Sequence, residues 1–242
     1  MEEKKQIWKV TPVLTGDFGM VRDDIKYRNG NPEIQEFVPS VLFLLESSGH
    51  QIVVDTGFGD PSLCSDKFQL CVRRNRSFEN ILKEASLNPE KIEAVIFTHL
   101  HWDHVGNAAS FSNAVYYCQK KEWERAQVYP DEYPKEWFSW LSKNRNRVRL
   151  IQGDDAEEIF SGIFVQYTGG HTCGSQMIIV CMENGYGIIT GDVVMTEKNM
   201  REEIPVGLCV NEEECQAVFE TIKKWKPVMV YPSHDFEIFN RR

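Results

Sequence analysis

The sequence has no apolar run long enough to cross a membrane, and its first residues do not indicate secretion. Its uninterrupted apolar stretches, such as residues 41–45, are far shorter than the ~20 residues that a membrane-spanning helix needs. The first eight positions hold neither an apolar core nor a small-residue cleavage site. We therefore expect a cytoplasmic protein without a membrane partner.

Paired cysteines and an excess of positive charge are also missing. The cysteines number 7, which is odd, and no two of them form a Cys-x-x-Cys motif. This usage is typical of reduced thiols and argues against a disulfide framework or a zinc ribbon. The formal net charge is -9, and the basic cluster at residues 143–149 is interpreted as a solvated turn or helix end. We therefore expect a small-molecule partner and no nucleic acid.

What is present is a chain of 242 residues that is 42% hydrophobic, long enough for one large core. Short apolar strands, as at residues 94–97, 163–167 and 228–231, alternate with amphipathic helices, one of them expected to begin after the N-cap residue Asn211. This alternation predicts an α/β layered fold. We expect a single domain over residues 1–242, with an aromatic-rich insertion around 123–147.

The most informative segment is a His-x-His-x-Asp-His pattern that directly follows the strand expected at residues 94–97. Its polar members are His99, His101, Asp103 and His104. Imidazole and carboxylate groups gathered in this way are ligands for zinc or a similar divalent ion. Other candidates each follow an expected strand, at the end where α/β folds collect their sites. They are His171, Asp192 and His234.

These residues, together with Asp55-Thr56-Gly57, resemble the metallo-β-lactamase superfamily over nearly the whole chain. The resemblance implies an αββα four-layer sandwich with two divalent metal ions at one edge: zinc, with iron, manganese or cobalt as alternatives. The implied ligands of the first ion are His99, His101 and His171. Those of the second are Asp103, His104 and His234. Asp192 would bridge the two ions, and Asp55 would orient a ligand.

The activity that the resemblance implies is hydrolysis. Two ions about 3.5 Å apart can share a hydroxide that attacks the substrate, with Asp103 and Asp192 as the catalytic carboxylates and Asp103 as the proton carrier. The layout is most similar to the acyl-homoserine-lactone lactonases, so we expect a lactone or ester to be opened. A thioesterase or phosphodiesterase on the same site is the alternative, and an iron-dependent persulfide dioxygenase a more distant one. The pattern is compatible with a homo-oligomer.

One position departs from the lactonase pattern. Those lactonases have a tyrosine three residues after the bridging aspartate, and here that residue is Met195. Loss of such a donor to the substrate carbonyl can cost about 10²-fold in rate. The sequence offers three other hydroxyls as substitutes: Tyr167, Tyr186 and Thr196.

Three residues are candidates for the substrate pocket: Met195, Trp137 and Phe58. Trp137 belongs to an aromatic-rich stretch, residues 123–140. Two interpretations of this stretch remain open: it forms a lid or apolar wall over the metals, or its rings pack it onto the sandwich.

Overall fold

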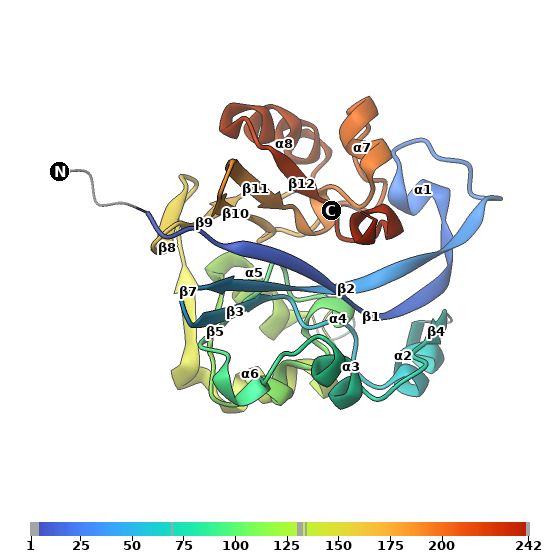
Figure 1. Ribbon diagram of the computed structural model, residues 1–242. Helices are drawn as coiled ribbons and strands as arrows, with labels where there is room; N and C mark the ends of the chain where they lie inside the picture. Colours follow the sequence, from blue (N-terminus) through green and yellow to red (C-terminus); the bar gives the residue numbers. More distant parts are fainter. Residues whose placement is uncertain (1–4, 69, 130–132, 134, 241–242) are drawn as a thin grey trace.

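The computed structural model describes residues 5–68, 70–129, 133 and 135–240, which contain two β-sheets flanked by helices (Figure 1). The first sheet has the strand order β4-β1-β2-β3-β5-β6-β7. Its strands are β1 (Lys9–Arg22), β2 (Gln35–Ser47), β3 (His50–Val54), β4 (Cys71–Arg73), β5 (Ala94–Ile96), β6 (Val115–Gln119) and β7 (Val148–Ile151).

The second sheet has the strand order β12-β11-β10-β9-β8. Its strands are β8 (Glu157–Phe160), β9 (Ile163–Tyr167), β10 (Gln176–Met182), β11 (Gly185–Ile189) and β12 (Met229–Tyr231). The α-helices in the described ranges are α1 (Asp23–Lys26), α2 (Pro61–Phe68), α3 (Phe78–Glu84), α4 (Trp102–Val105), α5 (Lys120–Val128), α6 (Lys135–Lys143), α7 (Glu197–Glu202) and α8 (Glu212–Trp225). None of them is long and apolar enough to cross a membrane.

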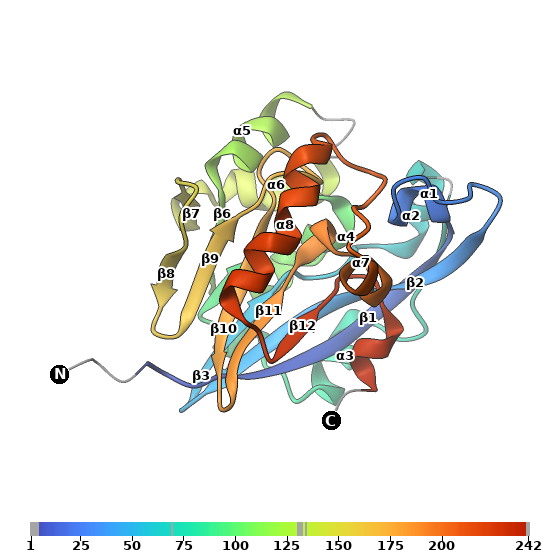
Figure 2. The ribbon, with the colours of Figure 1, turned by 90° about the horizontal axis from the view of Figure 1, so that it is seen from above.

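The layers follow from alternation along the central strands, whose successive side chains point to opposite faces. In β3, Ile52 and Val54 join the core between the two sheets, while Val53 joins the core beneath the helices. In β10, Ile178 faces the inter-sheet core and Ile179 packs with the core under α8. Helix α8 lies across the outer face of the second sheet (Figure 2). The predicted αββα four-layer sandwich is confirmed.

Strand β1 is longer than the sequence predicts. The sequence of residues 7–13 predicts a strand, but β1 runs from Lys9 to Arg22 and pairs with both β2 and β4. The register shifts near Gly16, where φ is +148°, and again beyond Phe18. A glycine within a strand pattern often indicates the end of the strand, but Gly16 is part of an irregularity inside β1. The extension carries Phe18 to the cavity described below.

Helix α8 begins directly after its predicted N-cap residue, Asn211. Its first turn contacts the loop between β9 and β10. The Asn211 side chain accepts a hydrogen bond from the Glu214 backbone N–H. The Glu214 carboxylate does not complete a capping box; it accepts a hydrogen bond of 2.8 Å from the Gly170 N–H. The loop that carries His171 is therefore held against the start of α8.

The aromatic segment around α5 and α6 packs onto the first sheet. The rings of Trp123 and Phe138 lie 4.9 Å apart, both buried, and the Trp140 indole N–H donates to the Tyr116 hydroxyl of β6. These contacts favour the packing interpretation of this segment over a lid. The side chain of Trp137 lies outside the described residues.

Candidate metal centre

The predicted ligand residues come from loops at the carboxyl ends of strands in both sheets. His99 follows β5, and His101 is the N-cap of α4, which contains Asp103 and His104. The other three come from the second sheet: His171 from the β9–β10 loop, Asp192 from the short 3-10 helix Gly191–Val193 after β11, and His234 from the segment after β12. The four-layer sandwich thus brings residues 135 positions apart in the chain, 99 to 234, to one edge.

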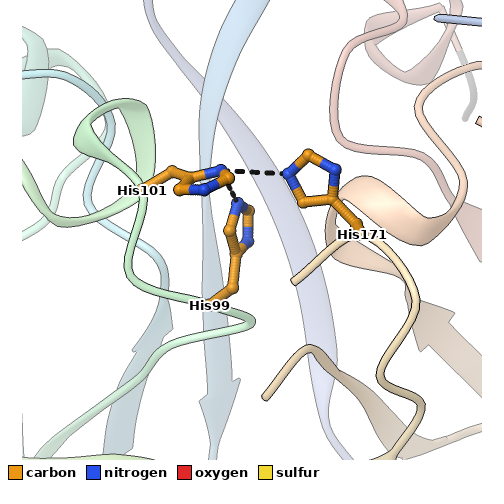
Figure 3. A group of neighbouring side chains, drawn as sticks. All are labelled: His99, His101 and His171. Atoms are coloured by element: carbon orange, nitrogen blue, oxygen red, sulfur yellow. Dashed lines mark hydrogen bonds between the residues drawn. The ribbon is translucent and has the colours of Figure 1, made fainter. Parts of the chain in front are cut away.

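Three histidines point their ring nitrogens at one spot (Figure 3). The Nε2 atoms of His99 and His171 each lie 3.0 Å from Nδ1 of His101. A proton on that Nδ1 can be donated to one of the two facing nitrogens and leaves the other lone pair unmatched. A cation among the three rings satisfies all of them, which is how imidazoles ligate zinc.

A second group of four side chains lies beside the first: Asp103, His104, Asp192 and His234, all buried. Oδ1 of Asp192 lies 3.1 Å from Nε2 of His104 and 3.1 Å from Nε2 of His234. Its other oxygen, Oδ2, lies 3.5 Å from Nε2 of His171 in the first group. The Asp192 carboxylate therefore stands between the two groups, the location that a bridging ligand requires.

The donor atoms of the two groups fit divalent cations. Nε2 of His104 and Oδ1 of Asp192 are buried and have no hydrogen-bond partner among the described residues. Unmatched buried polar atoms are costly, and a metal ion in contact with both removes that cost. A set of imidazole nitrogens and carboxylate oxygens suits zinc, iron, manganese or cobalt. Two divalent ions fit this arrangement.

The histidine rings are oriented by acceptors behind them. Nδ1 of His104 donates to Asp55 at 2.8 Å. Nδ1 of His171 donates to the Leu208 carbonyl at 2.7 Å, and Nδ1 of His234 donates to the Pro39 carbonyl at 2.8 Å. With Nδ1 protonated in each case, Nε2 presents its lone pair to the centre.

Burial and charge give the two groups opposite affinities for protons. Burial, helped by the nearby His104, lowers the pKa of His99 well below its usual value, and burial lowers the pKa of His171 to about 4. Burial acts in the same direction on His104, but Asp192 and Asp55 outweigh it and raise its pKa well above the usual value. His99 and His171 therefore offer neutral imidazoles, while the site around His104 attracts positive charge.

Sequence reasoning missed Glu122, a carboxylate with no exposed surface at the start of α5. Oε1 accepts from the Leu100 N–H and Oε2 from the Thr172 hydroxyl, at 3.0 and 2.7 Å. Leu100 lies between two predicted ligands, and Thr172 follows His171. Glu122 therefore ties together the loops of both sheets that carry the first group. A charged residue in an otherwise polar helix gave no signal of burial.

A cavity of about 520 Å³ opens onto the two groups, within the usual range for small-molecule sites. Five of the predicted ligands line it: His101, Asp103, His171, Asp192 and His234. Its walls are mostly apolar and include Phe18, Val21, Ile25, Val38, Leu70 and Leu208. The cavity therefore suits a substrate with an apolar part next to its reacting group.

Of the three residues predicted to line the pocket, one lines the cavity, one does not, and one has a side chain outside the described residues. Met195 lines the cavity. Phe58 does not: it is completely buried beneath Trp102, with the ring centroids 6.1 Å apart, because the chain after β3 turns its side chain into the core. This corrects the expectation for Phe58. The expectation for Trp137 concerns a side chain outside the described residues.

No substitute hydroxyl for the missing tyrosine lines the described cavity. The Tyr167 hydroxyl donates to the Cys173 carbonyl, and the Tyr186 ring packs on Trp225 on the outer face of the second sheet. Thr196 caps α7 and shares a hydrogen bond of 2.9 Å with the Tyr27 hydroxyl. None of the three hydroxyls that the sequence offers therefore faces this cavity.

Comparisons with known proteins agree with this geometry. The family model described as the metallo-beta-lactamase superfamily matches residues 36–234. An N-acyl homoserine lactonase of Bacillus cereus is 30% identical over 214 residues, which cover 83% of this chain and 82% of that protein.

Solved structures are also similar. A Bacillus thuringiensis AiiA mutant with N-decanoyl-L-homoserine bound at its active site matches with a TM-score of 0.82 and 25% identity, covering 98% of this chain and 96% of that one. The dizinc quorum-quenching lactonase AidC shares the fold, with a TM-score of 0.71 and 14% identity, over 97% of this chain and 90% of that one.

Proposed function

The chain belongs to the metallo-beta-lactamase superfamily, and from this membership we propose that it is a two-metal hydrolase that opens a lactone ring. The convergence of seven buried or half-buried ligand side chains on two adjacent groups carries the proposal. The similarity to N-acyl homoserine lactonases supports the choice of a lactone. The apolar cavity walls favour an acyl substrate over a phosphodiester, which would call for more positive charge.

In this proposal His99, His101 and His171 hold one ion, and Asp103, His104 and His234 hold the other, with Asp192 shared between them. Zinc is the proposed metal, because three imidazoles on one ion and a mixed imidazole and carboxylate set on the other suit it. Bound ions supply two things: an activated water at neutral pH and polarisation of the substrate carbonyl.

The chain's own side chains do the rest. Asp103 lines the cavity, with a carboxylate oxygen 3.4 Å from Nε2 of His234. It accepts the proton of the attacking water and returns it to the ring oxygen as the lactone opens. The apolar walls hold the substrate's apolar part and keep bulk water away from the reacting carbonyl.

The test is a pH-indicator assay of acid release from N-acyl homoserine lactones by the zinc-loaded protein. The matched control is Asp192→Asn, which keeps the size of the side chain but removes its charge. We expect acid release by the wild type, loss of nearly all of it in the variant, and a reduced metal content in the variant by elemental analysis. If the wild type with two ions bound hydrolysed none of the lactones, a lactone would be excluded as the substrate.

The same assay separates the alternative substrates. Thioesters and phosphodiesters are offered to the same zinc-loaded preparation at equal concentration. The proposal requires a higher kcat/KM for the lactones than for either class. A preference for one of the other two would reassign the substrate while leaving the metal-dependent hydrolase in place.

A further inference from the structure

A buried lysine lines the cavity without belonging to the metal centre. Lys26, the last residue of α1, has a side chain that is 2% exposed and is part of the cavity wall. Its ammonium group pairs with Glu36 and lies 3.3 Å from Asp23. Burying an ammonium group is costly, so its position beside a substrate cavity calls for an explanation.

Two hydrogen bonds place Lys26 at the corner of the cavity that Met195 occupies. The Lys26 backbone carbonyl accepts a hydrogen bond of 2.8 Å from the Asn199 amide. The neighbouring Tyr27 hydroxyl is bonded to Thr196, the residue after Met195. Helix α1 therefore packs against the segment that carries Met195, and both views show α1 and α7 on the same side of the molecule (Figures 1 and 2). Lys26 thus lines the cavity on the side formed by α1 and the segment that carries Met195.

The charges around Lys26 select the kind of group that it can bind. An ammonium group has three N–H donors, and the ion-pair partners of Lys26 in the described chain are two carboxylates. Burial disfavours the charged form and is the largest single effect, but the hydrogen bonds and charges of Glu36 and Asp23, with Tyr27, together outweigh it and raise the pKa of Lys26, so the group stays protonated. With one cation and two carboxylates the local charge is negative, which repels an anion. A neutral carbonyl oxygen is the fitting partner for a remaining N–H.

The carbonyl that Lys26 would bind is different from the lactone carbonyl that reacts. The ion-pair partners of Lys26 are Asp23 and Glu36, neither of them a predicted ligand, whereas the reacting carbonyl belongs at the metals. Arg125, the other cation on the cavity wall, lies 4.4 Å above the ring of Tyr129, a half-exposed residue. Of these two cations on the cavity wall, Lys26 is therefore the one with a buried side chain.

We propose that Lys26 binds a neutral carbonyl oxygen in the side arm of the substrate and so makes the site selective for N-acylated lactones. This inference rests on the proposed lactonase function. It assigns to Lys26 a role in specificity and none in the bond-breaking step. Binding of that carbonyl positions the lactone ring, so the effect appears in kcat/KM for substrates that possess the amide.

The experiment compares two lactones with and without the amide. Wild type and Lys26→Met are assayed, with two zinc ions bound, on an N-decanoyl-substituted and on a decyl-substituted five-membered lactone. Methionine keeps the length of the side chain and removes the donors. We expect kcat/KM to fall about 10- to 100-fold on the N-acyl lactone, the range for a lost hydrogen bond to a charged donor. On the alkyl lactone the ratio of wild type to variant should stay within about threefold, because no such bond is lost there.

Lys198→Met is the matched control. Nζ of Lys198 lies 4.3 Å from the same Tyr27 ring that Nζ of Lys26 approaches at 5.0 Å, but Lys198 is not among the cavity-lining residues. This variant should behave as wild type on both lactones. Lys26→Arg keeps a donor and a charge, so it should recover part of the loss; it also carries the test if Lys26→Met fails to fold or to retain two ions.

Each outcome decides between the two hypotheses. Equal losses on both lactones, or no loss on either, overturn the assignment to Lys26 and leave the lactonase function standing. Wild-type protein that hydrolyses neither lactone overturns the proposed function, and the assignment falls with it.

Discussion

The Asp55 carboxylate holds His104 in place: Oδ2 of Asp55 accepts a hydrogen bond of 2.8 Å from Nδ1 of the ring. The same carboxylate accepts two more bonds of 2.8 Å, from the backbone N–H and the hydroxyl of Thr98. Asp55 adopts a left-handed backbone conformation, with φ at +57°, which is strained for a residue with a side chain. Asp55 keeps this strained conformation while its carboxylate accepts hydrogen bonds from His104 and Thr98. This combination indicates that Asp55 serves to orient His104.

Asp55→Asn should weaken metal binding without unfolding the protein. The amide oxygen can still accept a bond from Thr98, but the amide nitrogen cannot accept the Nδ1 proton of His104, so the ring loses its orientation. We expect metal affinity or activity to fall about 10- to 100-fold, as for other residues that orient ligands. Competition with a metal-binding dye measures the affinity, and an unchanged affinity would show that His104 is held by the metal alone.

Local patterns in the sequence were sufficient to predict an α/β layered fold and to place the candidate ligands after strands, whereas the four-layer sandwich was implied by the resemblance to a known family. Uninterrupted apolar residues on β3 and β10 are typical of strands that are buried on both faces, and His99 lies in the loop that follows β5. The conformation of β1 could not be predicted in the same way, because Gly16 breaks the pattern locally while the pairing with β2 continues past it.

Lys26 and Glu122 could not be found from the sequence for a different reason. Both residues make contacts with distant segments: the Lys26 backbone carbonyl accepts a hydrogen bond from Asn199, 173 positions away, and the Glu122 carboxylate accepts one from Thr172, 50 positions away. A lysine or glutamate in a polar stretch is ordinarily exposed. Only the packed structure distinguishes these two residues from the solvated charges near them.

Glu122→Gln should destabilise the fold strongly. The carboxylate has four donors around it, two on each oxygen, the additional ones being the Tyr133 hydroxyl and the Gly174 N–H. An amide nitrogen would face two of these donors and leave them unsatisfied, which should cost about 2 to 5 kcal/mol of unfolding free energy. Urea unfolding measures the loss.

Glu124→Gln is the control for that change. It lies on the same helix, and its side chain is 62% exposed and 3.7 Å from Lys120. Its effect should stay below about 0.5 kcal/mol. Equal losses in the two variants would contradict the assigned network and point to a general effect of charge on α5.

The stability of the metal-free protein should depend on pH through His171. Burial lowers the pKa of His171 from 6.5 to about 4. Between these pH values His171 is therefore protonated in the unfolded chain and neutral in the folded chain. The folded state therefore loses stability as the pH falls from 6.5 to 4, by up to about 3 kcal/mol. His171→Gln removes this titration, so the stability of the variant relative to wild type should improve as the pH falls.

Urea unfolding of both chelator-treated proteins at about pH 7 and about pH 4.5 checks this linkage. The comparison of two proteins at each pH cancels the titration of His104 and His234, whose pKa values are raised and which act in the opposite direction. A difference between wild type and variant that is the same at both pH values would show that His171 is not buried in the neutral form.

Met195→Tyr tests whether a hydroxyl group at position 195 increases the rate of hydrolysis. Met195 is 4% exposed and packs with Val206 and Cys215, so a larger ring costs about 1 to 3 kcal/mol of stability through overpacking. Met195→Phe has nearly the same ring without the hydroxyl and therefore shares that cost. We expect kcat on an N-acyl homoserine lactone to be about 10-fold or more higher for tyrosine than for phenylalanine, because a hydroxyl near the developing oxyanion stabilises it. Equal rates for the two variants would mean that the reacting carbonyl is fully polarised at the metal centre, and that this chain gains nothing from a donor at position 195.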